Sequence, residues 1–402
     1  MAGLSLSLAL AVAVVGWLVL RDDTYVAPSP RTPSAAVEPG EAAAVLQRFE
    51  RAVRAGDADA AAALAPADDA AAADLLRAVV DNAAAIGVDR FTLRYVDAVG
   101  GVDQDGRWTA VVETTWRFPG FDRVASAADV EFDLRSETDG TTTLAGIGGS
   151  STISPVWLTG PVRVVRGPRA LVVAADDPGR YARLARAAVP VVRRVLPAWR
   201  AGLVVEVPRS GEELDDALGA EPGQYAAIAA VTSGVGDDLA PGVPIHVLVN
   251  PDVFASLDGR GARVVMSHEA VHVATEAATE PDVVPTWLTE GYADYVALRD
   301  VDLPLSVTAA QVARQVRREG LPARLPGDRR FDTRTTHLGA AYEAAWLACV
   351  LLAERSGEQA LTDFYAGLEA GDDVDAEFRR AFGLSVAAFT RRWRQALSDL
   401  PA

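Results

Sequence analysis

A pair of histidines one helical turn apart constrains the fold of this chain more than any other feature. The stretch 267–272 reads S-H-E-A-V-H. On a helix, His268 and His272 lie on the same face, so their two imidazole rings can share one metal ion. Glu269 follows the first histidine, where a carboxylate can take a proton from a metal-activated water. This H-E-x-x-H pattern predicts a metal-bearing helix over about residues 260–278.

A second helix is predicted to complete the set of ligands. It begins near Pro285, and its residues Glu290 and Asp294 are four apart, so they share one helical face. Glu290 can supply a third protein ligand and leave the fourth zinc position open for water. Asp294 can accept the free N–H of a zinc-bound histidine, which fixes the tautomer and orientation of that ring. The two helices together predict a catalytic Zn²⁺ site.

The motif residues resemble those of the gluzincin metallopeptidases, especially the peptidase-MA-like group related to thermolysin and the large zinc aminopeptidases. The matching residues are His268-Glu269-x-x-His272, Trp287-Leu288-x-Glu290-Gly291 and Asp294. The resemblance covers roughly residues 160–400 and implies a hydrolase, a zinc peptidase. It implies that His268, His272 and Glu290 hold Zn²⁺, that Glu269 is the general base, and that Asp294 supports a ligand. Seventeen residues separate His272 from Glu290, slightly fewer than in the best-known members, so a trimmed connection is expected.

The motif residues do not specify whether the peptidase is an exo- or an endopeptidase, nor which side chain donates to the oxyanion. The chain has no G-x-M-E-N-type substrate strand of the large aminopeptidases, so exo- and endopeptidase action both remain open. The oxyanion needs a donor besides zinc. Tyr342 is the predicted catalytic donor and His337 a weaker candidate, because related enzymes place a tyrosine or histidine downstream. Core packing is the open alternative for Tyr342, since a tyrosine on an apolar helix is commonly buried. His246 is predicted to be structural, and Tyr292 and Tyr295 could equally serve packing.

Residues 160–402 are predicted to form the metallopeptidase-like domain. Short apolar runs predict strands, and a helix is expected between the second and third of them; the ranges are 162–165, 170–175, 203–207, 226–231 and 245–249 for the strands and 179–196 for the helix. Stretch 226–233 is the candidate open edge, where an extended peptide could bind by backbone hydrogen bonds. The resemblance implies a thermolysin-like, two-lobed domain with a helical C-terminal half.

Residues 41–150 are predicted to form a small accessory domain, which makes the fold class α+β. Three helical segments precede four strand segments separated by Gly-containing turns. The opening stretch, 49–60, resembles the cone-shaped domains similar to nuclear transport factor two, which often serve as binding or spacing modules. No catalytic constellation is found in this domain.

The first twenty residues are predicted to be a membrane anchor or signal segment. Residues 3–20 carry no charge, and no small-x-small cleavage site follows convincingly, which favours a retained anchor. Residues 21–40 form a Pro-rich linker. The expected location is the cell membrane, with one N-terminal transmembrane helix and the bulk outside the cytoplasm; a secreted protein is the alternative.

Composition limits the kinds of partner and of cysteine-based site that the chain can have. The net charge of −17 argues against a nucleic-acid partner, and the single Cys349 excludes an internal disulfide and any multi-cysteine metal site. The expected partners are therefore a peptide or protein substrate and the membrane. The alternative is a non-catalytic, membrane-anchored envelope binding or scaffold protein that retains the fold. The presence of Glu269 favours the enzyme, because a scaffold has no need of a general base.

Overall fold

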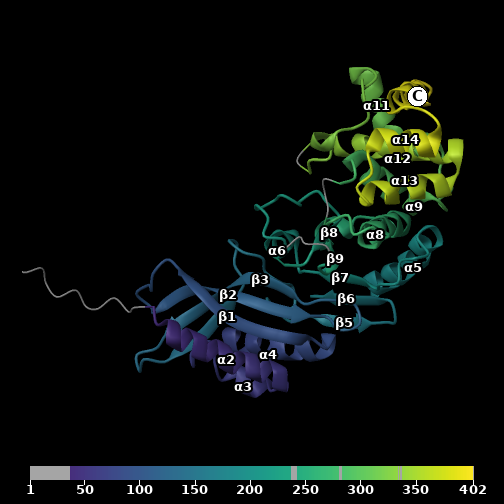
Figure 1. Cartoon of the computed structure of the whole chain (residues 1–402). Helices are drawn as coiled ribbons and strands as arrows, with labels where there is room; N and C mark the ends of the chain where they lie inside the picture. Colours follow the sequence, from purple (N-terminus) through teal and green to yellow (C-terminus); the bar gives the residue numbers. More distant parts are fainter. Residues whose placement is uncertain (1–36, 237–241, 280–282, 334, 336, 402) are drawn as a thin grey trace, which may run out of the picture. The chain divides into compact units, whose positions relative to one another are not determined.

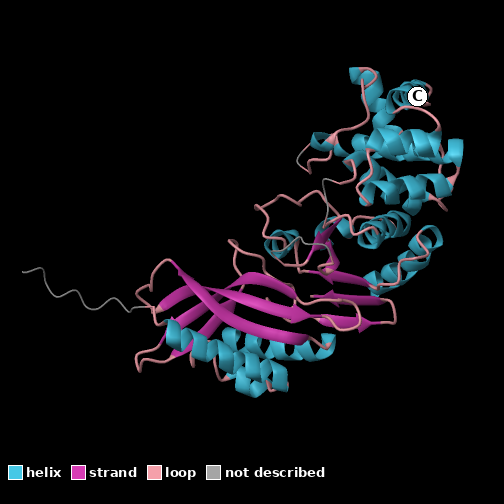
Figure 2. Ribbon diagram, in the orientation of Figure 1, coloured by secondary structure: helices cyan, strands magenta, loops and turns pink. Residues whose placement is uncertain are grey.

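The computed structural model describes residues 37–401 apart from 237–241, 280–282, 334 and 336. The described residues combine helices with one antiparallel and one mixed sheet, which confirms the α+β class (Figure 2). The predicted anchor, 1–20, and most of the predicted linker lie outside these residues. Among the described helices, none is both long enough and apolar enough to cross a membrane.

The N-terminal part consists of three helices and a four-stranded antiparallel sheet with the strand order β1-β2-β3-β4 (Figure 1). Its elements are α2 (Pro39–Ala55), α3 (Ala58–Ala62), α4 (Ala70–Ile86), β1 (Asp89–Val99), β2 (Arg107–Arg117), β3 (Ser126–Ser136) and β4 (Thr142–Ile147). Asp57 and Asp69 cap α3 and α4 by accepting hydrogen bonds from backbone amides. The likeness of this part to nuclear transport factor two stays a prediction.

A second sheet of five strands follows, in the order β5-β6-β7-β9-β8. The strands are β5 (Arg163–Arg166), β6 (Ala170–Ala174), β7 (Leu203–Val207), β8 (Ala230–Gly234) and β9 (Ile245–Val249). The three central strands are parallel, and the outer strands β5 and β8 run antiparallel to their neighbours. The position of β8 confirms the prediction of an edge strand in this region.

The start of β8 corrects the sequence prediction, which placed a strand at 226–231. The strand begins at Ala230 because the preceding residues are held in turns. Asp215 accepts hydrogen bonds from the backbone amides of Gly223 and Tyr225, at 2.6 and 3.0 Å. Such side-chain bonds to the backbone compete with strand pairing.

The second sheet is covered on both faces, because successive side chains of a strand point to opposite sides. On one face, Val172, Val205 and Val247 join a core with the helices α5 (Gly179–Val195) and α8 (Gly259–Ala274). On the other face, side chains of β6 and β7 belong to the core of the N-terminal part; they are Leu171, Val173 and Val204. Strands β6 and β7, at the centre of the sheet, are therefore packed on both faces.

After β9, every described regular element is helical, as predicted for the C-terminal half. The α-helices besides α8 are α7 (Pro251–Phe254), α9 (Thr286–Leu298), α10 (Leu305–Thr308), α11 (Ala310–Glu319), α12 (Leu338–Ser356), α13 (Glu358–Glu369), α14 (Val374–Phe382) and α15 (Val386–Ser398). Helix α9 packs against both α8 and α12. The two-lobed arrangement stays a prediction.

Helix α8 is shorter than the predicted range of 260–278. It ends at Ala274, where the hydroxyl of Thr275 donates to the carbonyl of Val271 at 3.0 Å. Glu276 then adopts a φ of 51°, in the left-handed region that ends a right-handed helix. The early end leaves His272 in the last turn of α8, close to the start of the connection to α9.

Candidate functional site

Three side-chain atoms converge between α8 and α9. The Nε2 atoms of His268 and His272 lie 3.0 Å apart, and Glu290 Oε2 lies 3.2 Å from the first and 3.3 Å from the second. These three residues form a group that could hold a metal ion. Tetrahedral zinc, with ligands at about 2.0–2.1 Å, places neighbouring ligand atoms roughly 3.3 Å apart. The triangle therefore fits the edge length of a zinc tetrahedron.

Asp294 orients the ring of the first histidine. Its Oδ1 lies 2.8 Å from His268 Nδ1. A carboxylate only accepts, so Nδ1 carries a proton, and Nε2 is the nitrogen that can give up its proton and turn a lone pair towards a metal in the triangle. A hydrogen bond of this kind fixes the ring and makes the imidazole a better ligand. Asp294 thus lies where the sequence predicts a supporting residue.

The charges around the triangle favour a cation at its centre. Burial alone would lower the pKa of His268, but the charge and hydrogen bond of Asp294, together with Glu290, hold it well above its usual value. Burial would raise the pKa of Glu290, but the rings of His272 and His268 hold it well below the usual range of a carboxyl group. Both shifts favour positive charge between the same atoms.

Glu269 lies beside the triangle, on the side of strand β8. It is buried, and its Oε2 accepts a hydrogen bond of 2.7 Å from the hydroxyl of Thr232. The sequence prediction did not single out Thr232. The signal available was its place within the predicted edge strand, because nothing in a V-T-S-G stretch specifies a partner on a later helix.

Tyr342 lies near the triangle. Its ring centroid is 5.8 Å from that of His268. The ring of Phe331 packs edge-on against that of Tyr342, with the two centroids 5.4 Å apart. Burial and the charge of Glu290 raise the pKa of Tyr342 well above its usual value, so its hydroxyl keeps its proton and can donate.

The structure places the other histidine and tyrosine candidates away from the triangle. His337 precedes α12 and faces Glu319 at 3.7 Å. The hydroxyl of Tyr295 donates to Glu358, and Tyr292 stacks on Tyr365. His246 is fully buried in β9 between Asp122 and Glu206, as expected for a structural residue.

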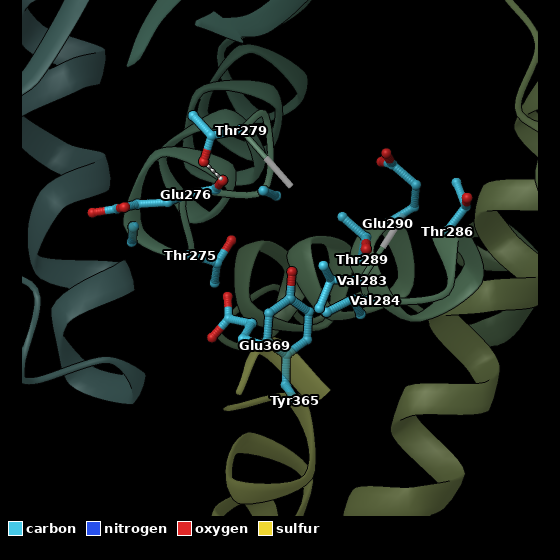
Figure 3. Close-up of a pocket in the computed structure, with 12 residues that line it drawn as sticks. Thr275, Glu276, Thr279, Val283, Val284, Thr286, Thr289, Glu290, Tyr365 and Glu369 are labelled. Carbon is cyan, nitrogen blue, oxygen red and sulfur yellow. Dashed lines mark hydrogen bonds between the residues drawn. The ribbon is translucent and has the colours of Figure 1, made fainter. Parts of the chain in front are cut away.

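A cavity of about 430 Å³ adjoins the third candidate ligand, Glu290 (Figure 3). Tyr365 and Glu369 reach into it from α13. The described lining residues include acidic, hydroxyl and aliphatic side chains and no basic one; they are Ala274, Thr275, Glu276, Ala277, Thr279, Val283, Val284, Thr286, Thr289, Glu290, Tyr365 and Glu369. The described lining of the cavity thus carries acidic groups without a basic partner beside apolar surface.

Comparisons with known proteins find only a distant likeness. No family model and no curated protein matches the chain. The M1 zinc metallopeptidase from Deinococcus radiodurans aligns over 67% of this chain at 17% identity, with a TM-score of 0.35. A mutant of that enzyme, alone and bound to a Tyr-Ser-Ala substrate, aligns at 16% identity with TM-scores of 0.33 and 0.34. The chain spans about six tenths of the length of these structures, 59–61%.

Proposed function

We propose that this chain is a zinc-dependent peptidase that hydrolyses peptide bonds with Glu269 as the general base. The observation that carries the proposal is the triangle of ligand atoms from His268, His272 and Glu290, with sides of 3.0–3.3 Å. The buried carboxylate of Glu269 lies on the same helix, next to the first ligand. A binding protein that used this fold as a scaffold would need neither feature.

The three ligands would hold Zn²⁺ and leave one position open. When bound, zinc would lower the pKa of water and polarise the scissile carbonyl. Glu269 would take the proton of the attacking water and deliver it to the leaving amine. Tyr342 would donate to the developing oxyanion, because its raised pKa keeps the hydroxyl protonated. Asp294 would hold His268 in the tautomer that presents Nε2.

A peptide is the substrate class that the edge strand favours. The amide of Val235 donates to Pro244, and the amide of Asn250 donates to Ala229. In an antiparallel pair, hydrogen-bonded positions alternate with outward-facing ones, so the backbone groups of Ala230, Thr232 and Gly234 face away from β9. Among the described residues, no further strand pairs with this edge. An extended peptide can use such groups for backbone hydrogen bonds.

The cavity beside Glu290 is the proposed site for one substrate side chain. Three glutamates line it, Glu276, Glu290 and Glu369, and none of its described lining residues is basic. A side chain that donates hydrogen bonds or carries positive charge would therefore be favoured there. A peptide-library cleavage profile tests this directly: selection for Arg, Lys or a hydroxyl residue at one position is expected. Selection for Asp or Glu at every sensitive position would contradict it.

We further propose that segment 1–20 anchors the enzyme in a membrane, with the rest of the chain outside the cytoplasm. Its support is the uncharged run 3–20 followed by a Pro-rich stretch. Membrane fractionation of the full chain, with and without the first 36 residues, checks this. Equal solubility of the two forms would count against an anchor.

Glu269→Gln is the decisive variant for the enzymatic proposal. The amide keeps the size of the carboxylate but cannot act as a base, so zinc content near one per chain and loss of peptide hydrolysis are expected. Unchanged turnover would refute the mechanism. A wild-type protein that binds zinc but cleaves no peptide in a broad library would favour the scaffold alternative.

A further inference from the structure

We infer that Thr232 is a positioning residue for Glu269, and that it links the placement of the general base to the strand along which the substrate would lie. This inference rests on the proposed function. The residue belongs to edge strand β8, whereas Glu269 belongs to α8, 37 positions later in the chain. The two side chains meet because Thr232 points to the face of the sheet that α8 covers.

The hydroxyl of Thr232 lies within hydrogen-bond distance of two acceptor atoms of Glu269. Its Oγ1 lies 2.7 Å from Glu269 Oε2 and 3.2 Å from the Glu269 carbonyl oxygen. A hydroxyl carries a single proton, and the shorter, charge-assisted bond to the carboxylate is the stronger one. This bond restricts rotation of the Glu269 carboxylate and so limits the orientations in which it would meet the attacking water.

Threonine suits this task better than serine does. Its branched Cβ restricts rotation about χ1, so the position of Oγ1 follows the position of the strand backbone. The same residue turns its own N–H and C=O to the free edge of β8, as the register with β9 requires. A peptide paired with this edge would therefore bond to the backbone of the residue whose side chain orients the base.

Thr232 could instead serve only stability, by giving the buried Glu269 carboxylate a hydrogen-bond donor. This structural role and the positioning role predict different effects of removing the hydroxyl. A structural loss lowers stability or zinc content. Loss of orientation lowers kcat and leaves KM near its wild-type value, because the base acts in the transition state rather than in substrate binding.

The test uses the full chain and three single variants: Thr232→Val, Thr232→Ser and, as the control, Thr390→Val. Valine keeps the shape and the branched Cβ but removes the donor. We expect a kcat reduced by about 10- to 100-fold, a KM within about twofold and unchanged zinc content. Serine restores the donor and should recover most of kcat. Thr390 lies on α15, outside the site, and its hydroxyl donates to the carbonyl of Val386, so Thr390→Val should behave as wild type.

A fourth comparison keeps the inference testable if Thr232→Val is less stable. In the Glu269→Gln background, Thr232→Val should change the residual rate by less than about twofold, because its effect acts through the carboxylate. A Thr232→Val kcat within about twofold of wild type, or equal losses in the valine and serine variants, would overturn the inference. An inactive wild type, or an active Glu269→Gln, would instead overturn the proposed function.

Discussion

Gly291 lies directly against the backbone of Ala345. A Cβ added to Gly291 would come 2.5 Å from the carbonyl oxygen of Ala345 and 3.0 Å from Cys349 Sγ. Helices α9 and α12 approach this closely only because Gly291 has no side chain. Gly291 directly follows Glu290 in α9. The packing of α9 on α12 therefore fixes the position of the third candidate ligand, Glu290, relative to α12.

Gly291→Ala is therefore expected to push α9 away from α12. We expect unfolding free energy to fall by about 1–3 kcal/mol, the usual range for overpacking, and zinc affinity to fall with it. Chemical unfolding and competition with a zinc chelator measure the two effects. Gly40→Ala is the control, because that helical glycine has open space around it and alanine is the better helix former. Equal effects of the two changes would contradict the packing argument.

Asp294→Asn tests the orientation of His268. The amide can present its NH₂ group to Nδ1 and so favour the wrong tautomer, with the proton on the nitrogen that should bind the metal. Zinc affinity is expected to fall by about 10- to 100-fold. Chelator competition measures it, and Asp300→Asn, at an exposed ion pair with Arg194, is the matched control. A zinc affinity equal to that of wild type would exclude the role of Asp294.

Much of this site could be predicted from the sequence because its spacing is helical. A four-residue interval places His268 with His272 and Glu290 with Asp294 whatever the rest of the fold does. The crossing of α8 and α9 brings the two pairs together.

Contacts between elements that lie far apart in the sequence could not be predicted from helical spacing. Thr232 reaches Glu269 through the order of strands in the sheet, which no local pattern encodes. The start of β8 and the end of α8 also differ from their predicted positions. Before β8 the Asp215 carboxylate accepts a hydrogen bond from a backbone amide, and at the end of α8 the Thr275 hydroxyl donates to a backbone carbonyl.

Tyr342→Phe separates donation from core packing. Phenylalanine keeps the ring contacts with His268 and Phe331 and removes only the hydroxyl. If Tyr342 donates to the oxyanion, kcat should fall by about 100-fold while KM and zinc content stay near their wild-type values. Steady-state kinetics with one cleavable peptide measures this. Loss of thermal stability with full kcat would instead identify a core residue.

His246 should make the stability of the fold depend on pH. Its Nδ1 lies 2.7 Å from Glu206 Oε1 and its Nε2 lies 3.0 Å from Asp122 Oδ1, with all three side chains buried. Burial alone would lower the pKa of His246, but the charges and hydrogen bonds of the two carboxylates raise it to about 9. The folded chain therefore holds this proton more tightly than the unfolded chain, whose histidine has a pKa of about 6.5.

A group whose pKa is raised by folding stabilises the folded chain. Its contribution to the free energy of unfolding is complete below the pKa of the unfolded state and is lost as the pH rises through the pKa of the folded state. The cluster should thus contribute on the order of 3 kcal/mol below about pH 6.5 and progressively less from pH 7 to above pH 9. Urea unfolding of wild type and His246→Gln across this range isolates the effect of the cluster, because titrating groups outside it cancel in the difference. The stability gap is expected to narrow with rising pH. A gap that stays constant to pH 10 would mean that His246 is neutral in the folded chain and holds Asp122 and Glu206 by hydrogen bonding alone.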